Sequence, residues 1–442
     1  MEDRQYSQFK RAYEYYQADP KYRALIREEP SAAVTELGLP DCDGKLILEV
    51  IEYILFRNTQ TDRDQPYIRE FTKRIGTVSD QAVKMVSADR YRDLRIAGFV
   101  QRTLNRARLE SAIFRAHTNI RYFPLGFELS EGCKVHCPFC GLNARKWSMD
   151  YSYKEGRKLW LDLLEASKEV IGDITDQAPL YYATEPLDNP DYEAFLGDVM
   201  ERFPCFPQTT TAVPERDIER TRRLMDSIGR ERLVNGARLR FTIRTLSQFK
   251  KIMEAFSPQE LEGVELIMNN PESVNGISAS GRLLGTKDGS SVYGDRHQIR
   301  YSISCLSGVK INLCEKTMTF MQPHIPDEKY PEGVLVSESV RFTEKDDIGA
   351  LLKGIFERNA KADLCEDMLI TLNDRVRIIE KENELILAGD GIGYSLKRNM
   401  FTEELLRKLQ NTETGIRVSE IENSFTIDEG SKGGLQSLIK EL

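Results

Sequence analysis

An alternation of strand-like and helix-like segments between residues 122 and 270 constrains the fold of this chain most strongly. The apolar segments of strand length are "FPLGFELS", "APLYYATEP", "FPQTTTAVP", "RLRFTIRT" and "GVELIMNN". Amphipathic segments of helical length, such as "YKEGRKLWLDLLEASKEVIG", separate them. Strands that alternate with helices indicate parallel βα units, and five or six units suit a closed or partial barrel. In such barrels the chemistry lies on loops at the C-terminal ends of the strands.

The regions before and after the alternation have different patterns. The first region predicts helices: Asp19 is placed to cap one helix and Ser31 the next, which would stop at Gly38. After about residue 300 the sequence predicts two extended segments, a helix, further strands and terminal helices. We therefore expect an α/β chain with a helical N-terminal region over 1–118, a partial (βα)6 barrel over 119–335 and a small winged-helix-like α+β domain over 336–442.

Composition and charge argue against several classes of function. The net charge is −8 without a strongly basic stripe, which disfavours nucleic acid because phosphate neutralisation supplies most of that affinity. No apolar run is long enough to predict a transmembrane helix, and the start "MEDRQYSQFK" lacks the apolar core of a signal peptide. We therefore expect a cytoplasmic protein with no membrane partner. In that reducing compartment, clustered cysteines indicate metal or redox chemistry.

Such a cluster follows the first predicted strand, in the segment "SEGCKVHCPFCGLNA". Three of the chain's 8 cysteines lie there: Cys133, Cys137 and Cys140. Thiolates suit zinc or iron–sulfur clusters, but a structural zinc site needs four ligands, and His136 is badly placed to be the fourth. Three thiolates on a four-iron cluster leave one iron open for a substrate or cofactor. The alternatives are three buried cysteines or a zinc knuckle. We expect Gly132 and Gly141 to let the backbone wrap the cluster closely.

The cysteine spacing, with Phe139 before the last cysteine, resembles the signature of the radical S-adenosylmethionine enzymes. The resemblance implies a [4Fe-4S] cluster on the loop after the first strand of a partial (βα)6 barrel. It also implies that the open iron binds S-adenosylmethionine, whose reductive cleavage yields a 5′-deoxyadenosyl radical that abstracts hydrogen. In the family pattern Phe139 packs near the adenine.

Further cofactor contacts are predicted at the ends of later strands. Thr184 and Glu185 lie in a segment, Ala183 to Pro186, that resembles the family's Gly-Gly-Glu-Pro-like motif with both glycines replaced. The resemblance implies that Glu185 holds the amino group of S-adenosylmethionine; the alternative is an ordinary turn. Candidates for the remaining contacts follow the next two strands, with plain strand residues as the alternative: Thr242, Arg244, Asn269 and Asn270.

The flanks of the barrel indicate a peptide substrate. The segment "ADPKYRALIREEPSAAVTELGLP" resembles the leaders of nitrile-hydratase-like peptide precursors. Four segments together resemble the proteusin-type radical peptide epimerases: "GFELSEGCKVHCPFCG", "YYATEPLDNPDYEAF", "FPQTTTAVPERDIERTR" and "SISCLSGVKIN". That resemblance implies conversion of L- to D-residues in a ribosomally made precursor peptide, with flavodoxin or ferredoxin as reductant. A generic pair of capped helices is the alternative for the leader-like segment.

Epimerisation requires a hydrogen donor on the opposite side of the substrate, and a thiol S–H suits that role. We expect the donor to be one of three late cysteines. Cys305 is the first choice because a sixth barrel strand would end there, inside the barrel mouth, and Cys365 and Cys314 follow it. Cys42 and Cys205 are expected to be small buried hydrophobes.

The tail resembles the winged-helix peptide-recognition modules first seen in a pyrroloquinoline quinone biosynthesis protein. Such a module could bind a leader by adding a strand to a sheet edge. A structural capping domain and a DNA-binding winged helix are the alternatives. For the whole chain two other functions stay open: a radical peptide splicease or crosslinking maturase, and a non-enzymatic protein that binds and delivers precursors.

Overall fold

The structure is a computed structural model of the 442-residue chain. It describes residues 3–39, 42–56, 66–74, 91–114, 122–173, 178–203, 206–236, 238–284, 298–361, 365–373, 375–389, 391, 393–412 and 415–424.

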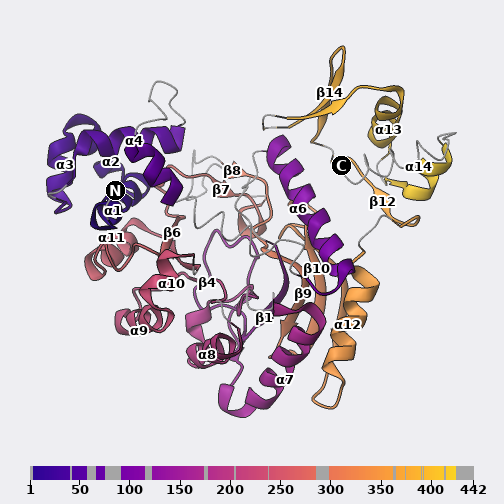
Figure 1. Cartoon of the computed structure of the whole chain (residues 1–442), viewed down its shortest axis with the longest axis horizontal. Coiled ribbons are helices and arrows are strands. Elements are labelled where there is room, and N and C mark those ends of the chain that lie inside the picture. Colours follow the sequence, from indigo (N-terminus) through magenta and orange to yellow (C-terminus); the bar gives the residue numbers. More distant parts are fainter. Residues whose placement is uncertain are drawn as a thin grey trace.

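A helical unit with its own core forms the N-terminal end, at the left of Figure 1. Its helices are α1 (Asp3–Ala18), α2 (Pro20–Glu28), α3 (Pro30–Glu36) and α4 (Gly44–Phe56). Asp19 caps α2 as predicted, because its side chain accepts the backbone N–H of Lys21 at 2.9 Å. The predicted cap at Ser31 is wrong: Glu29 occupies the cap position of α3 and Pro30 begins the helix. Gly38, with φ +64°, follows the end of α3.

Two sheets carry the middle of the chain. Strands β4 (Thr209–Thr211), β5 (Leu239–Ile243) and β6 (Glu265–Met268) are parallel neighbours in that order. The second sheet has the order β1 (Phe123–Glu128), β9 (Leu306–Asn312), β10 (Thr317–Pro323) and β11 (Val334–Arg341); β1 and β9 are parallel and the other pairs antiparallel. None of the sheets in the described ranges closes into a barrel. A partial barrel therefore stays a prediction.

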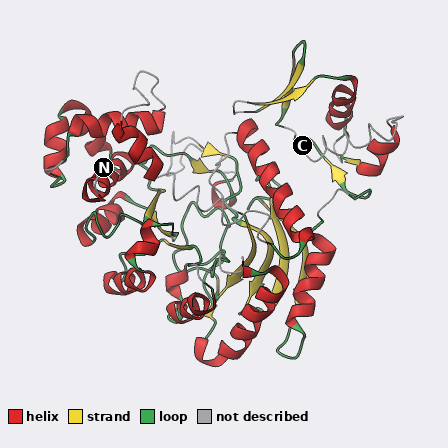
Figure 2. Cartoon of the chain, viewed as in Figure 1, coloured by secondary structure: helices red, strands yellow, loops and turns green. Residues whose placement is uncertain are grey.

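Helices cover the outside of these strands (Figures 1 and 2). They are α7 (Tyr153–Ile171), α8 (Tyr192–Arg202), α9 (Ile218–Ile228), α10 (Arg230–Val234) and α11 (Leu246–Ala255). Trp160 of α7 is fully buried and packs edge-on against Phe127 of β1 and Phe195 of α8. The helices predicted for this region are confirmed, because their apolar faces fill the main core against the strands.

One predicted strand, "APLYYATEP", is wrong, because residues 178–186 form no regular strand. The segment nevertheless lies between β1 and β4. The Pro179 carbonyl accepts the N–H of Phe127 at 2.8 Å, and the Tyr181 hydroxyl donates to Thr210 Oγ1 at 2.6 Å. Pro179 has no N–H to donate, and the N–H of Ala183 bonds to the Glu128 carboxylate at 2.8 Å, so a regular ladder does not form.

Strand β9 differs from the expected sixth barrel strand in two ways. It pairs with β1, with Phe123 opposite Leu306, so it extends the sheet on the β1 side. It also begins at Leu306, directly after Cys305, whereas the sequence predicts a strand that ends at Cys305. The choice of strand partner depends on contacts far apart in the sequence, which local patterns do not encode.

Two faces of β5 can be told apart by burial. Leu239, Phe241 and Ile243 are fully buried in the main core against the helices. Arg240 and Thr242 alternate with them and are half-buried on the opposite side, which we call the inner face. Because β5 is parallel to β4 and β6, its C-terminal end lies at the same edge as theirs.

The C-terminal unit, at the upper right of Figure 1, combines short antiparallel sheets with helices, and its winged-helix character stays a prediction. An antiparallel sheet has the order β13 (Arg377–Glu380), β14 (Glu384–Ala388) and β15 (Tyr394–Lys397). The remaining elements are β12 (Leu369–Ile370), α13 (Met400–Gln410), β16 (Ile416–Arg417) and α14 (Val418–Ser424).

Two helices join these regions: α6 (Leu94–Phe114) and α12 (Ile348–Asn359). The first half of α6 packs in the main core, and its last turns pack against Leu385 and Leu387 of the C-terminal sheet. Helix α12 also belongs to the main core. Helices on the far sides of the domain boundaries predicted at 118 and 335 therefore pack against the middle region of the chain.

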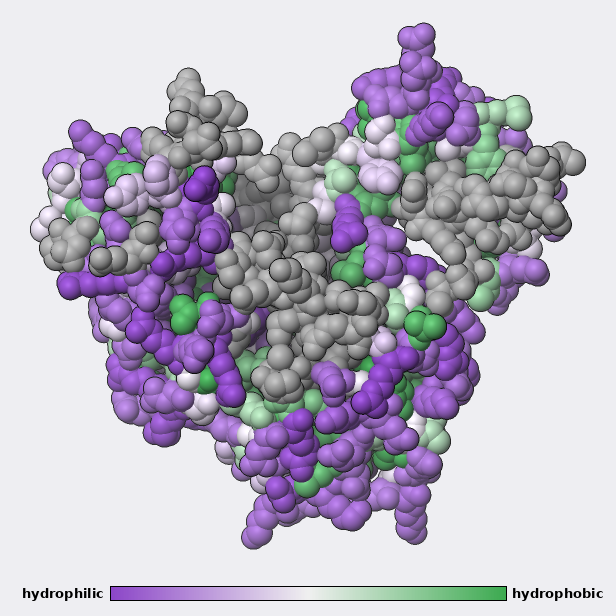
Figure 3. Space-filling model, in the orientation of Figure 1, coloured by the Kyte–Doolittle hydropathy of each residue, from purple (hydrophilic) through white to green (hydrophobic). Residues whose placement is uncertain are grey.

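The surface seen in Figure 3 is mostly hydrophilic. Among the described helices, none combines the length and the apolar character needed to cross a membrane.

Candidate cluster and substrate site

The cysteine loop, residues 132–144, begins just after the C-terminal end of β1. A short hairpin closes its base, in which β2 (Ser130–Glu131) pairs with β3 (Met149–Asp150). The N–H of Cys133 donates to the Arg145 carbonyl at 2.9 Å across the same base. The loop therefore projects from the strand end at which βα folds place their chemistry.

The two glycines that flank the cysteines let the loop pack closely against neighbouring protein atoms, and their role in wrapping a cluster stays a prediction. Gly132 has φ +76°, and a Cβ there would lie 2.2 Å from the Lys146 carbonyl oxygen. At Gly141 a Cβ would lie 2.4 Å from Ser280 Oγ. Both positions are therefore closed to a side chain by neighbouring protein atoms.

The three loop thiols lie within electrostatic reach of one another. Burial raises the pKa of the Cys137 thiol to about 12; Arg244 opposes this shift, while Cys133 and Cys140 add to it. Backbone N–H groups point at two of the sulfurs, since Val135 and His136 donate to Cys133 and Ala144 donates to Cys140 Sγ at 3.4 Å. Such donors favour thiolates, the form that binds metal.

The loop residues can be compared with the needs of two kinds of metal centre. In the described part of the chain, no three His, Cys, Asp or Glu side chains gather as ligands of a metal ion. A tetrahedral zinc ion would need four donors directed at one point. In a four-iron cluster each cysteine binds a different iron, so the sulfurs need only lie near one another. Cys133, Cys137 and Cys140 fit that looser requirement, with N–H groups available to their sulfurs.

Arg282 holds the cysteine loop from a distant part of the sequence. It lies on the short helix η4 (Gly281–Leu283) and donates to the carbonyls of Cys137, at 2.6 Å, and Ala144. It also contacts His136 Nδ1 at 2.9 Å. Sequence reasoning missed Arg282, because no local pattern marks a contact across roughly 140 positions.

Asp188 and Asn189 hold the base of the loop. Asp188 is buried; it accepts the N–H of Lys134 at 2.9 Å and an N–H of Arg216 at 2.6 Å. The Asn189 side chain donates to the Leu129 carbonyl at 2.8 Å. Sequence reasoning missed both, although they lie two and three residues after Pro186 of the Glu-Pro pair that the sequence singles out.

Glu185 is a buried carboxyl group beside these thiols. It is 3% exposed and accepts the N–H groups of Ala212 at 2.7 Å and Leu187 at 3.1 Å. Burial raises the pKa of Glu185 to about 7, while the backbone N–H groups partly oppose the shift. Its charge also raises the pKa of the Cys133 and Cys137 thiols, so the carboxyl lies close to them. Thr184 is half-buried in the same turn.

Arg244 reaches the cysteine loop from the C-terminal end of β5. Its Nε donates to the Ala212 carbonyl at 2.8 Å, and Glu215 pairs with it at 3.2 Å. The structure therefore brings Cys137, Glu185 and Arg244 together from three segments.

The other predicted cofactor residues lie around this centre. Thr242 is half-buried on the inner face of β5, two residues before Arg244. Asn269 is half-buried after β6, and its N–H donates to the Ile243 carbonyl at 2.8 Å. Asn270 donates to the Ala18 carbonyl at 3.0 Å and joins α1 to this region, which favours a structural role. Phe139 is 9% exposed and packs with Ile277, Leu283 and Cys137.

Two short parallel strands complete this region: β7 (Ile277–Ser278) and β8 (Gln298–Ile299).

The late cysteines lie in three different places. Cys305 precedes β9, near Phe123 at the start of β1, and thus at the opposite end of the sheet from the cysteine loop. Cys314 follows β9 at the same end as the loop, where burial and nearby carboxylates such as Glu131 raise its thiol pKa to about 12. Cys365 lies in the C-terminal unit, in a turn in which its carbonyl accepts the N–H of Met368 at 3.0 Å.

The early cysteines are also separate from the loop. Cys42 is half-buried in the N-terminal unit, 3.3 Å from Gln8 Oε1. Cys205 lies outside the described residues.

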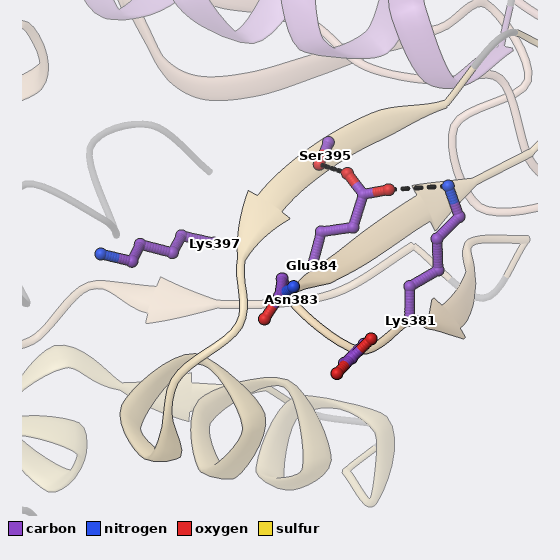
Figure 4. A pocket seen from close by; sticks show the side chains of 6 residues that line it. Lys381, Asn383, Glu384, Ser395 and Lys397 are labelled. Atoms are coloured by element: carbon purple, nitrogen blue, oxygen red, sulfur yellow. Dashed lines mark hydrogen bonds and ion pairs between the residues drawn. The ribbon is translucent and has the colours of Figure 1, made fainter.

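A surface hollow of about 620 Å³ lies on the C-terminal unit, beside β14 and β15 (Figure 4). The Glu384 carboxylate points toward Lys381, at 2.7 Å, and toward Ser395. Because this carboxylate is already paired within the hollow, the hollow does not suggest a ligand.

Comparison with known proteins finds a relative of uncharacterized function. A protein from Sinorhizobium fredii (strain NBRC 101917 / NGR234), named uncharacterized protein y4wI, is 28% identical over 371 residues. The match covers 80% of this chain and 70% of the relative, whose name assigns no activity. No family model matches the chain, and no solved structure matches it.

Proposed function

We propose that this protein is a radical S-adenosylmethionine peptide epimerase that converts L- to D-residues in a ribosomally made precursor peptide. The observation that carries the proposal is the grouping of three loop thiols with Glu185 and Arg244 at one end of the strands. A carboxyl and a guanidinium beside a cysteine loop suit the amino and carboxylate groups of S-adenosylmethionine.

Cys133, Cys137 and Cys140 would hold a [4Fe-4S] cluster, and Phe139, Thr184, Glu185, Thr242, Arg244 and Asn269 would contact S-adenosylmethionine. When bound, this pair supplies a carbon-centred radical able to remove a hydrogen atom from a peptide Cα. Arg282 and Asp188 would position the cysteine loop, since both hold its backbone. Glu215 would orient Arg244 through their ion pair of 3.2 Å.

Cys305 is our choice of hydrogen donor. The return of hydrogen must come from the face opposite the abstraction, and Cys305 and the loop lie at opposite ends of the sheet. Arg240 and Arg238 oppose the rise that burial causes in the pKa of Cys305, so this thiol lies within their reach beside β5. Cys314 lies at the same end as the loop, which suits an opposite donor less well.

Donation breaks the Cys305 S–H bond and forms the new Cα–H bond. The sulfur radical left on the protein is then reduced by one electron and takes up one proton. Flavodoxin or ferredoxin is the proposed source of the electron. Burial raises the pKa of the Cys305 thiol, which favours the protonated form that the step requires.

The flanking units would bind the precursor. In the C-terminal sheet β13 and β15 are edge strands, and an extended leader could pair with either one. Ile379 on β13 is 46% exposed and would give such a leader an apolar contact. We place this activity in the cytoplasm, with no nucleic-acid or membrane partner.

The test is modification in heavy water of a precursor peptide that carries a nitrile-hydratase-like leader. Epimerisation predicts a gain of about one mass unit per modified residue, with no mass change in ordinary water. Cys305→Ala should abolish the gain, while Cys314→Ala, Cys365→Ala and the control Cys42→Ala should retain it. A mass loss or crosslink in ordinary water would instead favour a splicease or crosslinking maturase.

A further inference from the structure

Two arginines lie near Cys305 on the inner side of β5. Arg238 donates through Nη1 to Gln208 Oε1 at 2.5 Å, and Arg240 donates through Nε to Thr210 Oγ1 at 2.9 Å. Both residues are half-buried, and Arg238 Nε itself is buried. Both also lower the pKa of the Cys305 thiol, which places the three side chains close together.

A carboxylate acts on this pair from beyond ion-pair distance: Glu265 on β6, opposite Arg240 in the ladder, favours the charged form of both guanidinium groups. Arg220 and Arg244 each have a carboxylate partner, at 2.6 and 3.2 Å. Within the described ranges no carboxylate oxygen lies within 4 Å of Arg238 or Arg240, and Arg238 Nε is buried without a hydrogen-bond partner. Arg238 Nε is therefore an unsatisfied buried donor beside a second guanidinium group, and a bound anion would satisfy it.

The neutral side chains around the pair are already bonded to one another. The Tyr181 hydroxyl donates to Thr210 at 2.6 Å and accepts from the Gln208 amide at 3.1 Å. The Tyr182 hydroxyl donates to Ser304 Oγ at 3.0 Å. These bonds fix the walls of the site and leave the guanidinium N–H groups as its available donors.

We propose that Arg238 and Arg240 bind a carboxylate of the peptide substrate, which rests on the proposed function and names a feature of its substrate. Guanidinium groups recognise carboxylates through paired, charge-assisted hydrogen bonds. The carboxylate belongs either to an Asp or Glu side chain or to a peptide C-terminus. Arg240 on β5 lies four residues before Arg244, which directly follows the strand, so about 13 Å separates them at the usual strand rise. An extended peptide spans that distance in about four residues.

The experiment measures binding without any cofactor chemistry. The immobilised full-length chain is exposed to two pools of random heptapeptides, one with free C-terminal carboxylates and one with amidated ends. Bound peptides are identified by mass spectrometry. The test variant is Arg238→Gln/Arg240→Gln, and the matched control is Arg232→Gln, an exposed arginine on α10.

We expect carboxylate-bearing peptides to be enriched about tenfold on the wild-type chain, the size of one charge-assisted contact. Enrichment of Asp and Glu in both pools identifies a side-chain carboxylate, and enrichment confined to the free-acid pool identifies the C-terminus. The double variant should lose the enrichment and Arg232→Gln should keep it. No enrichment on the wild-type chain, or equal enrichment on the double variant, overturns the proposal.

Thermal unfolding separates binding from folding. Because burial of the two guanidinium groups costs hydration free energy, the double variant should unfold at no lower a temperature than the wild type. A markedly lower unfolding temperature would assign the arginines a structural role and also overturn the proposal. Cleavage of S-adenosylmethionine without carboxylate preference would refute this inference alone. Carboxylate preference without cleavage would refute the proposed function alone.

Discussion

At the residue scale, Glu185 makes stability depend on pH. Its folded pKa is about 7, against 4.5 for the free side chain, because burial disfavours the charged form. The folded chain therefore binds more protons between these values, so stability falls as pH rises from about 4.5 to 7 and is constant above. Glu185→Gln should remove about 2–3 kcal/mol of this loss. Urea unfolding of the cluster-free wild type and of Glu185→Gln at pH 5 and 7.5 measures the change in unfolding free energy. The same pH dependence in the two proteins would contradict the raised pKa of Glu185.

Asp188 is the second residue with a specific prediction. Asp188→Ala would leave the N–H of Lys134 without its acceptor and Arg216 without its ion pair. We expect a loss of about 1–3 kcal/mol of unfolding free energy and a lower iron content after reconstitution. The control is Asp226→Ala, an exposed position on α9 that should change neither value. Full iron loading of Asp188→Ala would show that the loop does not need this anchor.

Residues such as Asp188 and Arg282 mark the limit of sequence reasoning at this scale. The cysteine spacing, Glu185 and Arg244 could be singled out from local motifs and strand ends, and the structure brings these residues together. Arg282 could not, because its role comes from hydrogen bonds to a loop far away in the sequence.

At the element scale, the backbone conformation at the start of the cysteine loop depends on Gly132. Gly132→Ala combines a strained positive φ with a Cβ 2.2 Å from a backbone oxygen, so the loop base must shift. We expect this variant to lose stability and iron. Gly197→Ala in α8 meets nothing within 4 Å and should stabilise the chain by up to about 1 kcal/mol. Iron analysis and urea unfolding of both variants check this pair; equal behaviour would refute the role of Gly132.

Helices were predicted correctly where the apolar periodicity of the segment itself specifies them. Strand predictions failed where hydrogen bonds to residues distant in the sequence determine the structure. The apolar stripes of α7, α9 and α11 predict these helices directly. The 178–186 segment has strand-like composition, but Pro179 and the Glu128 carboxylate divert its backbone hydrogen bonds. The position of β9 beside β1 is a long-range pairing that no local pattern specifies.

At the scale of the whole molecule, the C-terminal sheet is connected to the main core through α6. The N–H of Lys381 donates to the Glu384 carbonyl, so in this antiparallel ladder Ile379 bonds inward to β14 and the N–H of Glu380 faces the free edge. If β13 receives the leader, Glu380→Pro should weaken binding of a leader peptide at least about tenfold, because proline removes an N–H from that edge. Glu380→Ala is the control for loss of the side chain alone. Fluorescence anisotropy with a labelled leader peptide measures the affinity. Unchanged binding by Glu380→Pro would exclude β13 as the docking edge.

The most direct test of the central claim is anaerobic reconstitution with iron and sulfide, followed by reduction with S-adenosylmethionine present. The account predicts about four irons per chain and release of 5′-deoxyadenosine, detected by liquid chromatography and mass spectrometry. Cys137→Ala should lose the product and Cys42→Ala should retain it. An iron-loaded chain that releases no 5′-deoxyadenosine, or a Cys137→Ala variant that releases as much as the wild type, would contradict the account.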